Sequence, residues 1–400
     1  MTRTIDDLTA RPLGKDAELA AAGGRLPGID RMRGLVILLM ALDHVRDFFD
    51  ADALRFDPTD LDRTYPALFL TRFVTHFCAP TFTFLAGVSA FLHGLSLEDR
   101  GQRSRFLWTR GLWLILLDIF VVSPVWTVGS GAIELGTLWA IGCGMIALSA
   151  LLYLPTRAVL AVGAAILLLH NLLDGVQAAQ FGAFAPLWNV LHEQGPLPFG
   201  LRGQVFYPVL PWIGVIALGY GLGPIFLTPP ERRARALISL GLAFLACFVA
   251  LRAAGVYGDA RLWRTFPDGA RTALSFLDIT KYPPSLHYAL VTLGVGLLLL
   301  PALERAGGAF GRVLATFGRA PLFAYVLHLY AILIAAFLVA LAKGVDLRGL
   351  EAGGPPPDNY GLGLAGAYVM WVLIVAAIYP ACAWFAGVKR RRRDWWLSYL

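Results

Sequence analysis

The sequence predicts an all-α polytopic membrane protein with about ten transmembrane helices. Of its 400 residues, 57% are hydrophobic and only 15% are charged, whereas soluble proteins carry about 25% charged residues. Several apolar stretches approach the roughly 20 residues that a helix needs to cross a hydrocarbon core. The net charge of +7 would suggest nucleic acid for a soluble protein. Here the basic residues fall mostly in short connections and at the chain ends, so nucleic acid is not an expected partner.

Three regions follow from the distribution of apolar and polar residues. Residues 1–30 are polar or small and lack the hydrophobic stretch of a signal peptide, which predicts a flexible cytosolic tail. Residues 31–388 are expected to form the ten-helix membrane domain, and residues 389–400 a basic and aromatic cytosolic tail. The predicted spans are 31–50, 67–94, 107–124, 134–154, 157–173, 204–226, 235–253, 285–302, 320–342 and 364–388.

Basic residues predict the orientation. If both termini are cytosolic, 21 of the 34 Lys and Arg residues lie in cytosolic segments, 10 in outer segments and the rest in spans. This bias follows the positive-inside rule. We therefore expect a multi-pass protein of the bacterial inner membrane with both termini in the cytosol.

Neither a metal site nor a repeat is evident in the sequence. Cys78, Cys143, Cys247 and Cys382 are isolated within predicted spans, without the spacing of a disulfide framework or a zinc site. No metal is therefore expected. The absence of an apparent internal repeat disfavours the transporter folds that are built from repeats.

The first span carries the strongest candidates for chemistry. Arg33 and His44 are eleven residues apart, so they share one helix face and lie about 16 Å apart along the axis. An arginine at the cytosolic mouth can grip the phosphates of coenzyme A in a bidentate fork. His44, deeper in the membrane, is then placed to act as a general base or to be acylated itself. Asp47 lies nearly one turn further on the same side and is expected to orient the ring, whereas Asp43 points about 100° away.

The second span runs in the opposite direction and adds Arg72 and His76. Antiparallel pairing with the first span would bring Arg72 to the depth of Asp47, where it offsets the acidic charges. It would also bring His76 to the depth of His44, which makes His76 a second candidate base. For Asp118 and His170, other ionisable residues within spans, a structural role is the expectation.

Later segments supply further candidates. Arg319 and His328 repeat the pairing of a surface arginine with a deep histidine. Both are therefore candidates to line a tunnel that holds an acyl-CoA donor. Lys281 precedes two prolines that fix a rigid helix entrance, which positions it at the rim of an outer cavity. Trp212, after Pro211 in the sixth span, belongs to a helix that is expected to be kinked. Lys281, Arg72, Asp43 and Trp212 are the candidate acceptor-binding residues.

At these residues the sequence resembles the bacterial heparan-α-glucosaminide N-acetyltransferase-like family. The first span, with Arg33, Asp43, His44 and Asp47, looks like the opening of that group, and its Arg-x10-His spacing is similar to that of the wider membrane acyltransferase group. The similar segments are spread from residue 29 to residue 400, so the resemblance extends over nearly the whole chain. They are residues 29–48, 75–87, 138–142, 207–212, 281–286, 318–328 and 395–400.

The resemblance implies transfer of an acetyl group from cytosolic acetyl-CoA, the donor substrate, to an amino sugar or glycan on the far side of the membrane. It is compatible with a homodimer in the lipid bilayer. One position departs from the family: the lysosomal enzymes have asparagine where this chain has His44, and their key histidine lies in a following stretch that here, over residues 50–65, contains none. Whether the acetyl group goes to an amine nitrogen, to a hydroxyl or to neither therefore stays open.

The alternative is a proton-coupled transporter of a small solute or lipid intermediate, with His44, Asp47, Arg72 and His76 as a proton relay. A membrane scaffold is a third interpretation.

Overall fold

The structure is a computed structural model that describes residues 26–345, 357, 359–392 and 394–399. The tail predicted over residues 1–30 therefore lies outside the described residues as far as residue 25. The helices are α3 (Pro27–Phe49), α4 (Pro66–Thr75), α5 (Cys78–Gly94), α6 (Arg100–Leu117), α7 (Ser123–Trp126), α8 (Thr137–Leu151), α9 (Thr156–Leu169), α10 (Ala185–Leu191), α11 (Val209–Leu222), α12 (Pro230–Ala254), α13 (Gly269–Leu277), α14 (Leu286–Arg305), α15 (Gly308–Arg319), α16 (Pro321–Ala342) and α18 (Leu364–Arg391).

Eight helical segments of the described chain are long and apolar enough to cross a membrane. They are Pro66–Gly94, Arg100–Trp126, Thr156–Leu173, Val209–Leu227, Pro230–Ala254, Leu286–Arg305, Pro321–Ala342 and Leu364–Arg391. Two more helices coincide with predicted spans: α3 has 23 residues but carries several charges, and α8 has only 15 residues. The predicted all-α multi-pass fold is confirmed, and the predicted number of about ten spans is approximately right.

Two of the spans are interrupted where ionisable side chains lie. The second span breaks between Thr75, the last residue of α4, and Cys78, the first of α5. Pro80 lies in the first turn of α5, where its missing N–H costs no helical hydrogen bond. In the third span, a π-helical turn begins at Asp118, whose carboxylate accepts hydrogen bonds from backbone N–H groups at the start of α8. Asp118 therefore caps a helix, a structural role.

Several boundaries differ from the predicted ones. Residues 302–319 were expected to be a connection, but α15 forms there and buries Leu314 and Phe317. The sixth span starts at Val209 and not at residue 204, because residues 203–205 form a strand. The last helix continues to Arg391, so the first part of the predicted C-terminal tail is helical, and Arg393 lies outside the described residues.

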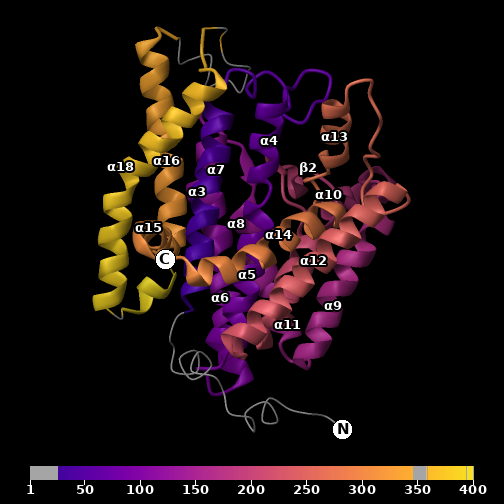
Figure 1. Ribbon diagram of the computed structural model, residues 1–400, viewed down its shortest axis with the longest axis vertical. Helices are drawn as coiled ribbons and strands as arrows, with labels where there is room; N and C mark the ends of the chain where they lie inside the picture. The colour runs from indigo at the N-terminus through magenta and orange to yellow at the C-terminus, as the bar shows by residue number, and fades with distance from the viewer. Residues whose placement is uncertain (1–25, 346–356, 358, 393, 400) are drawn as a thin grey trace.

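The helix α3 is at the centre of the bundle. It packs against α4, α5, α14, α15, α16 and α18. The other main helix pairs are α6 with α8, α9 with α11, α5 with α11, and α12 with α14. In Figure 1, α3 runs from the lower end of the molecule, where α18 finishes, to the upper end, with α16 and α18 on one side. Any side chain on α3 therefore lies close to several distant segments of the chain.

Short strands and helices fill the connections towards the upper end. Strands β1 (Ile133–Leu135), β2 (Gly195–Pro196) and β3 (Gly203–Val205) form a small sheet in the order β1-β3-β2, with β1 parallel and β2 antiparallel to β3.

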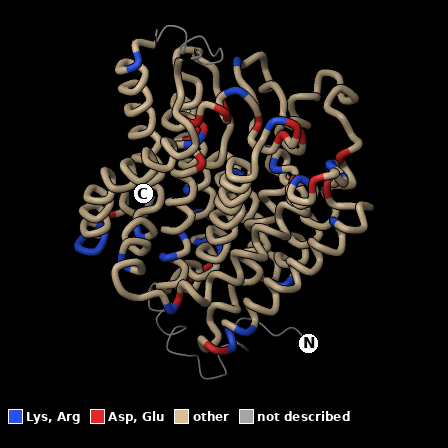
Figure 2. Tube along the Cα trace, turned by 45° about the horizontal axis from the view of Figure 1, so that its top comes forward, with Lys and Arg blue, Asp and Glu red and all other residues tan. Residues whose placement is uncertain are grey.

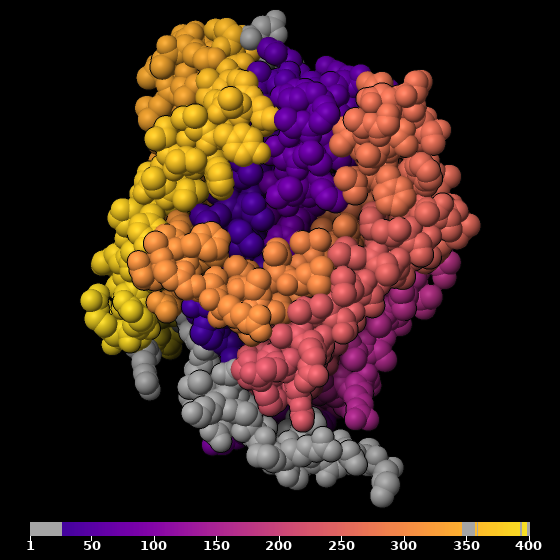
Figure 3. Space-filling model, viewed as in Figure 1, coloured from indigo at the N-terminus to yellow at the C-terminus, as the bar shows by residue number. Residues whose placement is uncertain are grey.

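Charged residues lie mostly in the connections and near helix ends, with long uncharged stretches between them (Figure 2). In Figure 3, the N-terminal helices are visible between the C-terminal helices and the coral segment that follows α12.

Glycines set the closest helix crossings. A Cβ atom on Gly34 of α3 would collide with the backbone of Leu314 in α15. A Cβ atom on Gly87 of α5 would collide with the backbone of Ile216 in α11, and one on Gly219 of α11 with that of Phe84. Small residues at such crossings allow backbones in a membrane to approach closely.

We expect Gly87→Ala to destabilise the bundle by roughly 1–3 kcal/mol, because the added methyl group must push two helix backbones apart. The matched control is Gly269→Ala at the start of α13, where a Cβ atom would meet nothing within 4 Å. Thermal unfolding of the two purified variants in detergent measures the difference. Equal melting temperatures would show that the α5–α11 crossing tolerates a larger separation.

Candidate functional site

The carboxylate of Asp43 binds three cationic side chains. Arg46, on the next turn of α3, lies 2.7 Å from it, Arg72 of α4 lies 3.0 Å away, and Lys281, just before α14, lies 3.5 Å away. Asp43 is 6% exposed and Arg46 only 1%. Buried charges are tolerated only when paired, so this ion cluster holds together three separate segments of the chain.

Two further groups complete this ion cluster. Thr75 donates a hydrogen bond to Asp43 at 2.5 Å and accepts one from Arg46 at 3.3 Å. The carboxylate of Asp47 lies 2.6 Å from Arg46. Three cations therefore face two carboxylates, which leaves one positive charge in excess. Such an excess favours a ligand that carries a negative charge or develops one during reaction.

A pair of histidines lies on α3 and α16. Nδ1 of His44 is 2.9 Å from Nε2 of His328, and the two rings are stacked with centroids 5.1 Å apart and an interplanar angle of 9°. Tyr325 contacts both rings edge-on, and Trp126 contacts His44 at 5.0 Å. The aromatic side chains therefore fix the orientation of the pair.

The hydrogen bonds of this pair define the tautomers. Nδ1 of His328 lies 3.0 Å from the carbonyl oxygen of Ala324. A carbonyl oxygen can only accept, so Nδ1 of His328 carries the proton and Nε2 of the neutral ring is the acceptor. Nδ1 of His44 must then donate to it. This assignment leaves the lone pair of Nε2 on His44 available to take up a proton or to attack an electrophile.

His76 lies at the break between α4 and α5. Its ring is 3% exposed and lies 5.5 Å from the ring of Tyr288, edge-on. The hydroxyl of Tyr288 donates to the backbone oxygen of His76 at 2.8 Å, which stabilises the break. Nδ1 of His76 is buried without a hydrogen-bond partner in the described chain.

A cavity of about 390 Å³ opens near the start of α3. Its polar lining includes Arg33, Arg319, Arg110 and Lys389. The guanidinium of Arg33 donates to the hydroxyl of Ser89 and lies 3.6 Å from Asp30. The apolar lining comprises, among others, Leu114, Leu138, Ile141, Met145 and Leu322. This lining combines cationic groups with an apolar wall and suits a ligand that has an anionic head and a neutral arm.

A second cavity of about 400 Å³ lies beside the first and shares Arg319 with it. Arg31, Arg312 and Arg390 also line this second cavity. Arg319 therefore lies between the two cavities, and both have a basic lining.

Along α16, successive turns lead from the first cavity to the histidine pair. Leu322 lines the cavity, and Tyr325, three residues further, contacts the rings of His44 and His328. Residues at this spacing share a helix face. The same face of α16 therefore borders both the cavity and the pair.

Aromatic side chains surround the ion cluster on the side of Lys281. The Tyr282 ring lies 5.1 Å from Nζ of Lys281 and 5.2 Å from the ring of Tyr207. Tyr207 in turn lies 5.3 Å from Trp212, so these two tyrosines connect Trp212 to the ion cluster. Burial raises the pKa of Tyr282 to about 12, although the nearby Arg72 opposes this shift. The phenol is therefore protonated at neutral pH and able to donate a hydrogen bond.

The structure groups the sequence candidates differently from the expectation. His328, expected beside Arg319 in the donor tunnel, pairs with His44. Asp47, expected to orient the His44 ring, binds Arg46. Arg72, expected to lie at the depth of Asp47 and to offset the acidic charges of the first span, binds Asp43, one of those acids. Each difference arises because the spacing on one helix defines a face but not which distant segment meets it.

Sequence reasoning gave no role to Arg46, Thr75 or Tyr325. For Arg46 a signal was present: it follows Asp43 by three residues, the spacing of a helical ion pair. Thr75 and Tyr325 carry no comparable signal, because their positions depend on how α4 and α16 pack against α3.

We expect Asp43→Asn to lower the free energy of unfolding by roughly 3–5 kcal/mol, since it removes the carboxylate that the buried Arg46 and Lys281 share with the partly buried Arg72. Asp62→Asn is the control: Asp62 pairs with Arg264 at 3.5 Å, but both side chains are largely exposed, so its loss should change stability by less than about 1 kcal/mol. Thermal unfolding in detergent compares the two. A small effect of Asp43→Asn would mean that water or another acid neutralises the cations.

Comparisons with known proteins identify the family. None of the curated proteins matches the chain. The family model for heparan-alpha-glucosaminide N-acetyltransferase, catalytic, matches residues 25–257. This match includes Arg33, Asp43, His44 and Arg72 but ends before Lys281. Because it covers more than half of the chain, the protein belongs to the heparan-alpha-glucosaminide N-acetyltransferase catalytic family, a membrane acetyltransferase-like family.

Proposed function

We propose that the protein transfers an acetyl group from cytosolic acetyl-CoA to an amino sugar or glycan on the extracytoplasmic side of the bacterial inner membrane. The observation that carries this proposal is the arrangement along α3. This helix lines a basic cavity with Arg33 at its start and presents His44 and the Asp43 ion cluster further along. Family membership supports the same reaction class.

The two cavities near the start of α3 are the proposed donor site. Arg33 and Arg319, with the neighbouring basic side chains, bind the phosphates of coenzyme A through charge-assisted hydrogen bonds. The apolar wall that includes Leu322 accommodates the pantetheine arm. Leu26, just before α3, and Lys389, near the end of α18, line the same cavity, so these two ends of the described chain lie on one side. The positive-inside rule supports a cytosolic location for that side.

In the proposed reaction His44 acts as the general base. The acceptor nitrogen attacks the thioester carbonyl carbon and passes its proton to Nε2 of His44. The carbon–sulfur bond then breaks, and the leaving thiolate of coenzyme A takes the proton from Nε2 of His44, which returns His44 to its neutral form. His328 accepts the hydrogen bond from Nδ1 of His44 throughout, so the positive charge that forms on His44 is shared between the two rings. We assign His76 as a secondary base.

The ion cluster around Asp43 is the proposed acceptor-binding region. Lys281 and Arg72 are held by Asp43 and carry the excess positive charge, which can stabilise the oxyanion of the tetrahedral intermediate or bind polar groups of a sugar. Trp212, with Tyr207 and Tyr282, offers aromatic faces beside it. The same buried acids and histidines would also suit a proton relay, which is why a transport function is a distinct outcome of the assays below.

Arg33→Ala should weaken binding of coenzyme A roughly 10- to 100-fold, because phosphate loses a pair of charge-assisted hydrogen bonds. Arg33→Lys should recover only part of the affinity, since an ammonium group lacks the planar fork. Calorimetry with coenzyme A and purified protein measures both. Arg264→Ala, an exposed arginine, is the control. Unchanged affinity in Arg33→Ala would remove Arg33 from the donor site.

His44→Ala should lower acetyl transfer by roughly 10²–10⁴-fold while coenzyme A still binds. His328→Ala should lower the rate less and should also shift the pH profile, because it changes the tautomer and basicity of His44. The double variant should be no worse than His44→Ala, since residues that act as a unit are not additive. The assay follows labelled acetyl-CoA with a panel of amino sugars and hydroxylated glycans enclosed in vesicles.

Vesicle orientation tests the proposed sidedness in the same assay. Inside-out vesicles, which expose the cytosolic face, should use external acetyl-CoA, and right-side-out vesicles should not. Full activity of both His44→Ala and His328→Ala would place the chemistry elsewhere, with His76→Ala as the next variant. Absence of any acetylated product, together with proton-coupled solute uptake by the wild type, would favour the transporter.

A further inference from the structure

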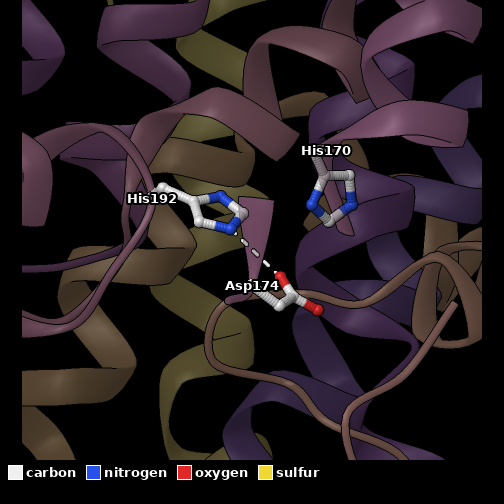
Figure 4. Close-up of side chains that lie close together, drawn as sticks. All are labelled: His170, Asp174 and His192. Atoms are coloured by element: carbon white, nitrogen blue, oxygen red, sulfur yellow. Dashed lines mark hydrogen bonds and ion pairs between the residues drawn. The ribbon is translucent and has the colours of Figure 1, made fainter. Parts of the chain in front are cut away.

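A second group of functional side chains lies at the end of α9, away from the elements that carry the proposed site. His170, Asp174 and His192 each offer a ligand atom, and these atoms all lie within 4.8 Å of one another. Nε2 of His192 is 3.0 Å from Oδ1 of Asp174. Figure 4 shows that the three side chains converge on a common space.

Local structure brings these residues together. His170 starts a short 3-10 helix, His170–Leu173, and Asp174 follows its last residue. The two residues are therefore only four positions apart at the end of α9. The chain then returns through α10, and His192 follows its last residue. There the His192 ring contacts Trp188 at 5.5 Å and the His170 ring at 5.8 Å. The three residues thus depend on the loop closing back on α9.

The polar atoms of this group are poorly satisfied. His170 is 2% exposed and His192 3% exposed. Both ring nitrogens of His170 and Nδ1 of His192 are buried without a hydrogen-bond partner in the described chain. Buried polar atoms are nearly always paired in proteins, so such orphaned nitrogens call for an explanation. A structural role in packing alone, which the sequence suggested for His170, leaves both of its nitrogens unexplained.

The carboxylate is held by a supporting residue. Asn171 donates from Nδ2 to Oδ2 of Asp174 at 2.8 Å, and its Oδ1 accepts from the backbone N–H of Leu286 at 2.9 Å. Oδ1 of Asp174 is thereby turned towards His192. Outer hydrogen bonds of this kind orient the ligands of metal sites.

We propose that His170, Asp174 and His192 bind one divalent transition-metal ion, for which Zn²⁺ is the best match. Two imidazoles and one carboxylate are a common zinc ligand set, with a fourth position left for water. Imidazole ligands disfavour Mg²⁺ and Ca²⁺, which prefer oxygen. The Asp174 side chain is 27% exposed, so water and the ion have access to the site.

The required rearrangement is small. In a tetrahedral site with metal–ligand bonds of about 2.1 Å, ligand atoms lie about 3.4 Å apart. The 3.0 Å separation of His192 and Asp174 is already close to that value. Since all three ligand atoms lie within 4.8 Å of one another, the remaining ligand needs to move inward by at most about 1.4 Å. The ion would satisfy one nitrogen of His170.

The ion would brace the upper end of the bundle. It would tie the end of α9 to the residue after α10, and Asn171 connects this group to Leu286, the first residue of α14. Lys281, which binds Asp43, lies only five residues before Leu286. The proposed metal is therefore structural and separate from the acetyl-transfer site, and its test does not depend on activity.

The test uses the full chain purified through a tag that contains no histidine, treated with EDTA, desalted and titrated with ZnCl₂. Mass spectrometry of the metal content should give about one zinc per chain. Thermal unfolding should shift upwards by a few degrees at a hundredfold excess over Kd, whereas MgCl₂ should give no shift. Absence of stoichiometric zinc in the wild type overturns the proposal without recourse to variants.

Variants identify the ligands. Asp174→Asn and His192→Gln should each weaken zinc binding more than roughly 100-fold, and Asn171→Ala roughly 10- to 100-fold, the usual cost of losing an outer partner. The matched control is His287→Gln: His287 is also buried with both ring nitrogens unpartnered in the described chain, but it lies outside this group. Equal zinc binding by Asp174→Asn and the wild type, or equal loss in His287→Gln, contradicts the assignment.

Discussion

The pairing of Asp43 with three cationic side chains constrains the arrangement of the bundle. Arg46 comes from the same helix, Arg72 from α4, and Lys281 from the connection before α14. A carboxylate or a cation alone is costly in a low-dielectric interior, and breaking such a pair costs more than forming it gains. The chain must therefore bring α4 and the start of α14 against α3 before the ion cluster is satisfied. This requirement also fixes the backbone around His76, because α4 ends one residue before it.

Because α3 is packed on several sides, it contributes residues to the basic cavity, to the histidine pair and to the ion cluster. Its first turns line the basic cavity through Arg33, and its last turns carry both the ion cluster and His44, which lies beside His328. The glycine contact with α15 keeps Gly34 against a neighbouring backbone, which limits sliding of α3 relative to the cavity wall. The distance from cavity to histidine pair is therefore set by one rigid helix and not by a loop.

The sequence predicted those features that depend on a single helix, and missed those that depend on tertiary contacts. Hydrophobic length predicted the spans, and the eleven-residue spacing put Arg33 and His44 on one face. The contact between His44 and His328 joins residues 284 positions apart, so no local pattern indicates it. Helix α15 was missed because its amphipathic sequence, with Arg312 and Arg319, resembles a basic connection. The group of His170, Asp174 and His192 was missed because a loop separates its members.

The family match ends at residue 257, yet the interactions described above cross that boundary. Lys281, Arg319 and His328 lie beyond it. Asp43, which binds Lys281, His44, which pairs with His328, and Arg33, which lines the same cavity as Arg319, lie before it. A fragment that stops at the boundary would leave His44 without its hydrogen-bond partner and the cavity without part of its wall. The segment that the family model matches is therefore shorter than the segment that makes these contacts. Residues from both sides of the boundary must be present together to form the histidine pair and the basic cavity.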